Sequence, residues 1–191
     1  MSNWVEWLWE EDQPAMPKLK RLSIVACPKL SSLPKVLLFH ATSLEILQII
    51  AAKQIKSVEN LKSVKELRVL ENPNLDRISN LPNLSFIRIR DCPNLKILEN
   101  LKFFHRMELS DIQMETLPEY LITTMLEKLT IWCKDELLVK ITSQGIGDTE
   151  WKKFEHIPLV KIYSNDQSLY AKYRKSSFSF NTNVDQQNQR N

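Results

Sequence analysis

The sequence predicts an α/β solenoid, in which short parallel strands line a curved concave face and irregular or short helical segments form the convex face. Two observations lead to this prediction. Short segments that alternate apolar and polar residues recur along the 191-residue chain, and each is followed by a turn and a returning apolar residue. The spacing between successive segments is also nearly constant over most of the chain. One such segment cannot bury its own apolar face, so it needs copies of itself on both sides.

The clearest copy spans residues 84–98, with the sequence LSFIRIRDCPNLKIL. Its apolar residues follow the spacing L-x-x-L-x-L-x-x-C-x-x-L, which is typical of leucine-rich repeats. Ile87 and Ile89 are expected to form the buried face of a strand. The strand must end before Pro93, because proline has no N–H group to donate. The two leucines that follow return toward the interior.

Six further copies begin at residues 19, 44, 64, 104, 126 and 157, which gives steps of 25, 20, 20, 20, 22 and 31 residues when the clearest copy is included. All steps but the last lie within the ~20–29-residue period of leucine-rich repeats. The long last step indicates an insertion between Asp135 and His156, interpreted as an exposed loop because it holds the only two glycines of the chain. The strands are expected near Leu22–Ile24, Leu47–Ile49, Leu67–Val69, Ile87–Ile89, Met107–Leu109, Leu129–Ile131 and Val160–Ile162.

Residues 1–165 are therefore predicted to form one solenoid of about seven repeats. Residues 1–18 carry three of the five tryptophans and are interpreted as the back segment of an earlier repeat, so we expect a piece of a longer protein or a truncated copy of one. From residue 166 the chain turns polar, and residues 166–191 are predicted to form a disordered tail. The sequence leaves open whether its aromatic residues, Tyr170, Tyr173, Phe178 and Phe180, dock back on the solenoid.

The composition argues against several classes of partner. A net charge of +3 is too small to indicate nucleic acid or a membrane surface as the main partner, and no apolar run approaches the ~20 residues of a membrane span. Cys27 and Cys92 occupy the same repeat position, which favours buried free thiols over a disulfide or a zinc site. Free thiols and the lack of a signal peptide indicate a cytoplasmic protein.

No catalytic constellation is recognisable. The three histidines, His40, His105 and His156, lie in different repeats, and none accompanies a nucleophile motif. A phosphate loop of the type G-x-x-x-x-G-K-[ST] is missing from the sequence, so we expect this chain to bind neither ADP nor ATP. The sequence therefore predicts a protein that is not an enzyme and that holds no cofactor or metal.

Residues 19–34, LKRLSIVACPKLSSLP, and residues 84–98 resemble the C-terminal repeats of plant nucleotide-binding leucine-rich-repeat disease-resistance proteins. Residues 147–163, GDTEWKKFEHIPLVKIY, resemble the closing repeat of the cereal members, and residues 3–19 resemble their tryptophan-rich lead-in. Ile112 and Lys134 depart from the family, which has Cys or Asn at these turns. The resemblance covers about residues 1–165. It implies an intracellular immune receptor whose repeats sense pathogen effectors or host proteins and keep the receptor's nucleotide switch off.

A second interpretation is a substrate-recognition module of another intracellular complex, such as a ubiquitin ligase. In both cases the strand residues between the buried positions would face the partner. Arginine and aromatic side chains are enriched in interface hot spots, although solvated charges also line sheets that bind nothing. The predicted protein-binding residues on the concave face are Arg68, Phe86, Arg88, Arg90, Arg106, Lys128 and Trp132. The best-matched partner is an acidic protein surface with an apolar centre: an effector, a host protein or the receptor's own nucleotide-binding domain.

Overall fold

The computed structural model describes residues 16–34, 37, 40–144 and 148–184 of the chain. The chain divides into two compact units, unit 1 (residues 1–104) and unit 2 (residues 105–191). The predicted packing of the N-terminal tryptophans lies outside the described residues, as does the final segment, residues 185–191.

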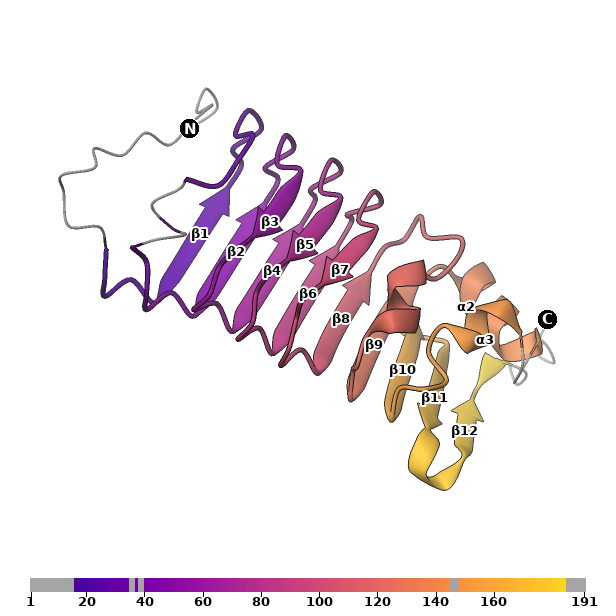
Figure 1. Ribbon diagram of the computed structural model, residues 1–191. Helices are drawn as coiled ribbons and strands as arrows, with labels where there is room; N and C mark the ends of the chain where they lie inside the picture. Colours follow the sequence, from indigo (N-terminus) through magenta and orange to yellow (C-terminus); the bar gives the residue numbers. More distant parts are fainter. Residues whose placement is uncertain (1–15, 35–36, 38–39, 145–147, 185–191) are drawn as a thin grey trace. The chain divides into compact units, whose positions relative to one another are not determined.

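Unit 1 is a repeat solenoid whose front sheet consists of parallel strands (Figure 1). These strands are β1 (Arg21–Val25), β2 (Ile46–Ile50), β4 (Glu66–Leu70) and β6 (Phe86–Arg90). Equivalent repeat positions pair with one another, so that Leu47 lies between Leu22 and Leu67. In β2, β4 and β6 the second and fourth residues are buried, whereas the others are half-buried or exposed. The predicted parallel stack of strands is confirmed in this unit.

The back of unit 1 is a second sheet, whereas the sequence predicted irregular or short helical segments on this side. It contains β3 (Ser57–Glu59), β5 (Arg77–Ser79) and β7 (Ile97–Glu99), which are parallel and in register. The central residue of each strand, Val58, Ile78 or Leu98, is buried against the front sheet. A repeat of 20 residues leaves too little chain for a helix on the way back, and an extended strand covers the required length with fewer residues.

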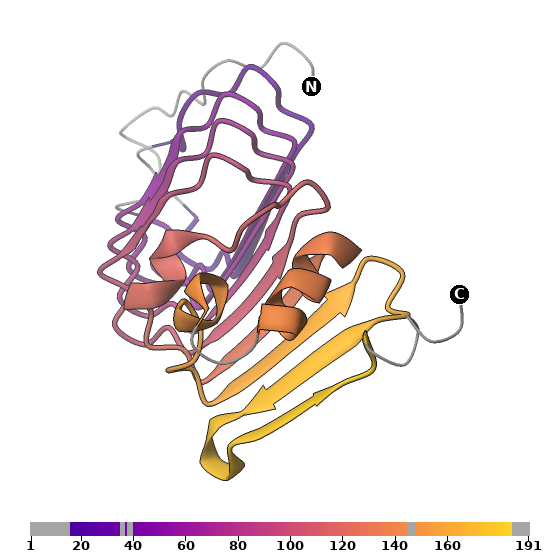
Figure 2. The same cartoon turned by 90° about the vertical axis from the view of Figure 1, so that its right-hand side faces the viewer.

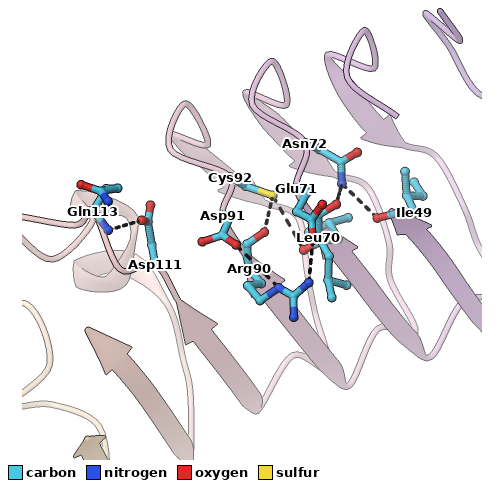
Figure 3. A network of polar contacts seen from close by, with 10 residues as sticks. Ile49, Leu70, Glu71, Asn72, Arg90, Asp91, Cys92, Asp111 and Gln113 are labelled. Carbon is cyan, nitrogen blue, oxygen red and sulfur yellow. Dashed lines mark hydrogen bonds and ion pairs between the residues drawn. The ribbon is translucent and has the colours of Figure 1, made fainter. Parts of the chain in front are cut away.

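The turns after the front strands explain why the repeat carries Cys or Asn. Each strand is followed by one residue with a positive φ angle, Ala26, Ala51, Glu71 or Asp91. The next side chain then turns inward beneath the strand ends. Asn72 is fully buried there, and its amide nitrogen donates to the carbonyls of Ile49 (2.9 Å) and Leu70 (2.8 Å) (Figure 3). Its amide oxygen accepts from the Ala52 N–H at 3.0 Å.

Cysteine fulfils part of the same role at the equivalent positions. The Cys92 thiol donates to the carbonyls of Arg90 (3.3 Å) and Val69 (3.7 Å), and the Cys27 thiol donates to the carbonyl of Val25 (3.4 Å). Cys27, Cys92 and Cys133 are all buried, and none forms a disulfide. Three of the four equivalent positions of unit 1, Cys27, Asn72 and Cys92, therefore donate to strand-end carbonyls, whereas the fourth is the buried Ala52, which has no side-chain donor.

An asparagine ladder follows the back strands. Asn60, Asn80 and Asn100 each adopt a positive φ angle of 55–61°, a conformation that asparagine tolerates better than most residues. The Asn100 amide nitrogen donates to the Asn80 side-chain oxygen at 2.8 Å, and Asn80 donates to Asn60 at 3.1 Å. The ladder links successive repeats through their side chains.

Unit 2 continues the same strand pattern. β8 (Arg106–Ser110), β9 (Lys128–Cys133) and β10 (Leu159–Ser164) are parallel, with equivalent repeat positions paired. These are the last three strands expected from the sequence. A short 3₁₀ helix, η1 (Glu119–Thr123), lies on the connection between β8 and β9.

The insertion between β9 and β10 is helical, so the interpretation of an exposed loop was wrong. It contains α2 (Asp135–Gln144) and α3 (Thr149–Lys152). α2 buries Leu137, Leu138 and Ile141 and packs against β10 and β11 (Figure 2). These three residues have the i, i+1, i+4 spacing of a helical face, so the sequence did carry a signal for this helix.

α3 is fixed by charged side chains that are buried. The Glu150 carboxylate accepts from the Leu117 N–H at 2.7 Å, and the Lys153 ammonium donates to the Leu117 carbonyl at 2.7 Å. Lys153 and Glu150 also face each other at 3.5 Å, and Lys140 lies 3.6 Å from Glu150. Asp148 caps the helix by accepting from the N–H groups of residues 150 and 149, and these hydrogen bonds lower the pKa of its carboxyl.

The C-terminal region differs from the predicted disordered tail. β11 (Tyr170–Arg174) pairs antiparallel with β10, and β12 (Ser179–Thr182) pairs antiparallel with β11, with η2 (Lys175–Ser177) between them. Tyr173 and Phe180 contact Trp151 at ring distances of 5.1 and 5.2 Å, so these two aromatic residues do dock back, whereas Phe178 is 84% exposed. The polar residues of this segment occupy the outward positions of the hairpin, such as Lys172 and Arg174 on β11, whereas Ala171 and Tyr173 between them are buried.

A compact polar turn joins β10 to β11. The Asp166 carboxylate accepts from the Ser164 hydroxyl at 2.6 Å and from both the hydroxyl and the N–H of Ser168, at 2.8 and 2.9 Å. These hydrogen bonds, with that from Ser164 the strongest, lower the pKa of Asp166 to about 2. The Ser164 hydroxyl also accepts from the Leu169 N–H at 2.9 Å, so the turn is closed from both sides.

Candidate functional site: the outward faces of the two sheets

Four of the seven predicted binding residues belong to unit 1 and three belong to unit 2. Arg68, Phe86, Arg88 and Arg90 all occupy outward positions of β4 and β6. Arg68 and Arg88 are direct partners in register, so their backbones are ~4.8 Å apart. The repeat architecture therefore brings these four side chains onto one face of unit 1, as predicted.

Carboxylates accompany the arginines of unit 1. Arg68 forms an ion pair with Glu66, and Arg90 forms ion pairs with Glu71 (2.7 Å) and Asp91 (3.6 Å) (Figure 3). All of these side chains are at least partly exposed, so each pair contributes only about 0–1 kcal/mol to stability. These ion pairs also neutralise much of the positive charge on this part of the face.

The unit 2 group has a different character. Arg106 and Lys128 are partners in register on β8 and β9, and the Arg106 guanidinium pairs with the buried Glu108 carboxylate at 2.9 Å. Trp132 is half-buried and stacks on Tyr163, with ring centroids 6.1 Å apart and an interplanar angle of 25°. This face therefore combines cations with aromatic rings that hold one another in place.

Sequence reasoning missed the part of this face that lies on β11. Lys172 is the register partner of Lys161, and Tyr170 is the register partner of Tyr163, so both extend the outward face of unit 2. Arg174 lies on the same side of β11. The alternation in YAKYR, residues 170–174, with the buried Ala171 and Tyr173 between polar residues, was the signal that could have revealed this strand.

Two classes of feature are not found in the part of the chain that the structure describes. No group of three or more potential metal ligands is present there. None of the described helices has the length and apolar character needed to cross a membrane.

Burial, with a smaller effect of the Asp135 carboxylate, raises the pKa of the Cys133 thiol to about 12. The Nε2 atom of His156 forms a hydrogen bond with the carbonyl oxygen of Thr124 at 2.9 Å.

The chain was also compared with known proteins. No family model, curated protein or solved structure matches it. The structure itself shows a mixed α/β solenoid of stacked parallel strands, a fold that is compatible with a leucine-rich repeat and with a protein-interaction module.

Proposed function

We propose that this chain is the protein-recognition repeat module of a plant intracellular immune receptor. In that role it acts in the cytoplasm, senses pathogen effectors or host proteins, and contributes to autoinhibition of the receptor. It works without catalysis and without a cofactor. The resemblance of residues 19–34, 84–98 and 147–163 to the repeats of disease-resistance proteins supports the immune role.

The observation that supports the recognition role is the alternation of buried and exposed side chains along each strand. In β6, Ile87 and Ile89 are buried, whereas Arg88 and Arg90, next to them in the sequence, are exposed. Strand register then sets outward side chains at intervals of ~4.8 Å across the sheet. Buried positions specify the fold, and outward positions can vary to suit a partner without any cost to the core.

The proposal can be tested by photo-crosslinking in the full receptor. A photo-reactive residue replaces either Arg88, on the outward face, or Lys96, which is exposed in the same repeat but precedes the back strand β7. We expect position 88 to capture a specific protein and position 96 not to do so. Equal capture at the two positions, or capture at position 96 alone, would contradict recognition through the front sheet.

The autoinhibitory part needs a separate readout. If the front sheet of unit 1 contacts the receptor's own nucleotide-binding domain, Arg88→Glu should trigger a defence response without a pathogen, whereas Lys96→Glu should leave the receptor silent. A ubiquitin-ligase module is the alternative function. Its signature would be a ligase scaffold protein that co-purifies with the full-length protein, with no nucleotide-binding domain in the same polypeptide.

A further inference from the structure

The outward face of the unit 2 sheet carries a row of aromatic residues that crosses three strands. Trp132 on β9 is the register partner of Tyr163 on β10, which is the partner of Tyr170 on β11. We call these three residues the aromatic row. All three are half-buried, so the row is a partly exposed apolar strip that is held on a rigid sheet.

Basic residues run parallel to this row along the same strands. Lys161 and Lys172 are register partners in the next row, two residues along each strand and thus ~7 Å from the aromatic row. Lys128 and Arg174 lie one row further on. With Arg106, the outward positions of β8 to β12 hold five cations.

This positive charge is poorly compensated. The single carboxylate among those outward positions is Glu108, which is only 7% exposed and already pairs with Arg106. Lys128, Lys161 and Arg174 form no ion pair with any residue that the structure describes. Like charges paired across strands, such as Lys161 and Lys172, are unfavourable in isolation. The face is therefore complementary to a ligand that brings several negative charges.

We propose that this face, as one site for the protein recognition proposed above, binds an acidic, apolar-containing polypeptide segment. The segment crosses β9, β10 and β11, with apolar side chains on the aromatic row and carboxylates on Lys161, Lys172 and the basic row beyond them. Two steps between strands cover ~10 Å, which an extended segment spans with about three residues at ~3.4 Å each. A short linear motif is thus long enough to occupy the site.

The geometry of the rings favours a polypeptide over single-stranded nucleic acid. Bases bind such surfaces by stacking on open ring faces. Here Trp132 and Tyr163 stack on each other, and the Lys172 ammonium lies 4.6 Å from the centre of the Tyr170 ring. Each of the three rings therefore already contacts a neighbouring side chain within the site. The ring edges and the polar Tyr and Trp tips are better suited to side-chain and backbone contacts of a peptide.

The test uses the full chain and fluorescence anisotropy with three labelled probes. The first is a short peptide of repeated Glu–Glu–Leu triplets, the second is the same peptide with glutamine in place of glutamate, and the third is a single-stranded oligouridylate. We expect the acidic peptide to bind with an affinity that falls as salt is added. The glutamine peptide and the oligouridylate should bind at least about tenfold more weakly, which corresponds to about 1.4 kcal/mol.

Matched variants then separate the site from net charge. Lys161→Glu with Lys172→Glu reverses the charge at these two positions and keeps a like-charged register pair, so the repulsion between the two strands is similar in the parent and the variant. Lys53→Glu with Lys62→Glu makes the same change in net charge on exposed residues of unit 1. We expect the first variant to lose the acidic peptide and the second to keep it within about twofold, a small change beside the tenfold steps above.

Several results would overturn the proposal. Equal losses in the two double variants would show attraction by net charge alone, and tighter binding of oligouridylate would indicate a nucleic-acid surface. If circular dichroism shows that the first variant does not fold, Lys161→Gln with Lys172→Gln replaces it. Unchanged affinity of that variant for the acidic peptide would then refute the proposal. Crosslinking at Arg88 reports on unit 1, so it can succeed when the acidic peptide fails, and the two proposals can fall separately.

Discussion

Asn72 offers a sharp test of how the repeats are held together. It is fully buried, and its side chain makes hydrogen bonds to Ile49, Leu70 and Ala52. We expect Asn72→Ala to destabilise unit 1 strongly. Asn94→Ala is the matched control, because Asn94 is an exposed asparagine of the next repeat that donates a single hydrogen bond to the carbonyl of Pro73 at 2.7 Å.

The expected magnitude follows from the groups left behind. The Leu70 carbonyl also accepts from the Ala51 N–H at 3.0 Å, so it keeps a partner in the variant. The Ala52 N–H loses the side-chain acceptor while it remains buried, which costs about 1–3 kcal/mol. With the cavity left by the side chain, Asn72→Ala should cost about 2–4 kcal/mol, against about 0.5–1 kcal/mol for Asn94→Ala. The loss of stability in Asn72→Cys should lie between the losses in Asn72→Ala and Asn94→Ala, because a thiol donates to the strand-end carbonyls at the equivalent Cys92.

Urea unfolding followed by circular dichroism measures these differences from the midpoint and the slope. Hydrogen exchange at the Ala52 amide provides a local readout, and it should accelerate in Asn72→Ala but not in Asn94→Ala. The reasoning is refuted if the two alanine variants lose equal stability at an unchanged slope. It is also refuted if exchange at Ala52 does not respond to Asn72→Ala, since the lost hydrogen bond is its central premise.

Three further predictions concern other parts of the chain. Ile89→Asp should prevent unit 1 from folding, because burial of this 1%-exposed side chain is worth about 1.5–3 kcal/mol and an unpaired buried carboxylate costs more on top of that loss. Arg88→Ala should melt like the parent, so equal melting curves for the two variants would contradict this prediction. Since the pKa of Asp166 is lowered to about 2, the stabilising effect of its ionised carboxylate should be lost as the pH falls from about 4 to about 2. The melting temperature of the Asp166→Asn variant should therefore depend less on pH over that window than the melting temperature of the parent. Cys133, with its pKa raised to about 12, should resist alkylation near pH 8 until denaturant is added, and rapid labelling of the native protein would disprove its burial.

The strands of both units were predictable because their signal is local and repeated. Leu67 and Val69 are spaced like Ile87 and Ile89, and burial of one pair requires burial of the other once the strands are in register. A 20-residue period therefore fixed register as well as element type. The outward position of Arg88 followed directly from this alternation.

The end of the chain was harder to predict, because its signals are not repeated. β11 and β12 pair antiparallel, so they carry no repeat spacing, and only the short alternation in residues 170–174 marks the first of them. The contact of Tyr173 and Phe180 with Trp151 depends on helix α3, which sequence reasoning took for a loop. For the same reason the basic residues of β11 could not be assigned to the outward face of unit 2.

The asparagine ladder has a consequence for how such a protein can change length. Asn60, Asn80 and Asn100 follow one another at intervals of 20 residues, and the side chains of successive rungs are joined by hydrogen bonds. An in-frame duplication of one interval adds a rung whose donor and acceptor meet partners identical to those already present. A one-residue insertion, by contrast, turns the buried side of every later strand in that repeat outward. Unequal recombination between repeats can therefore lengthen or shorten the outward face in whole units, while the chemistry of the interior stays the same.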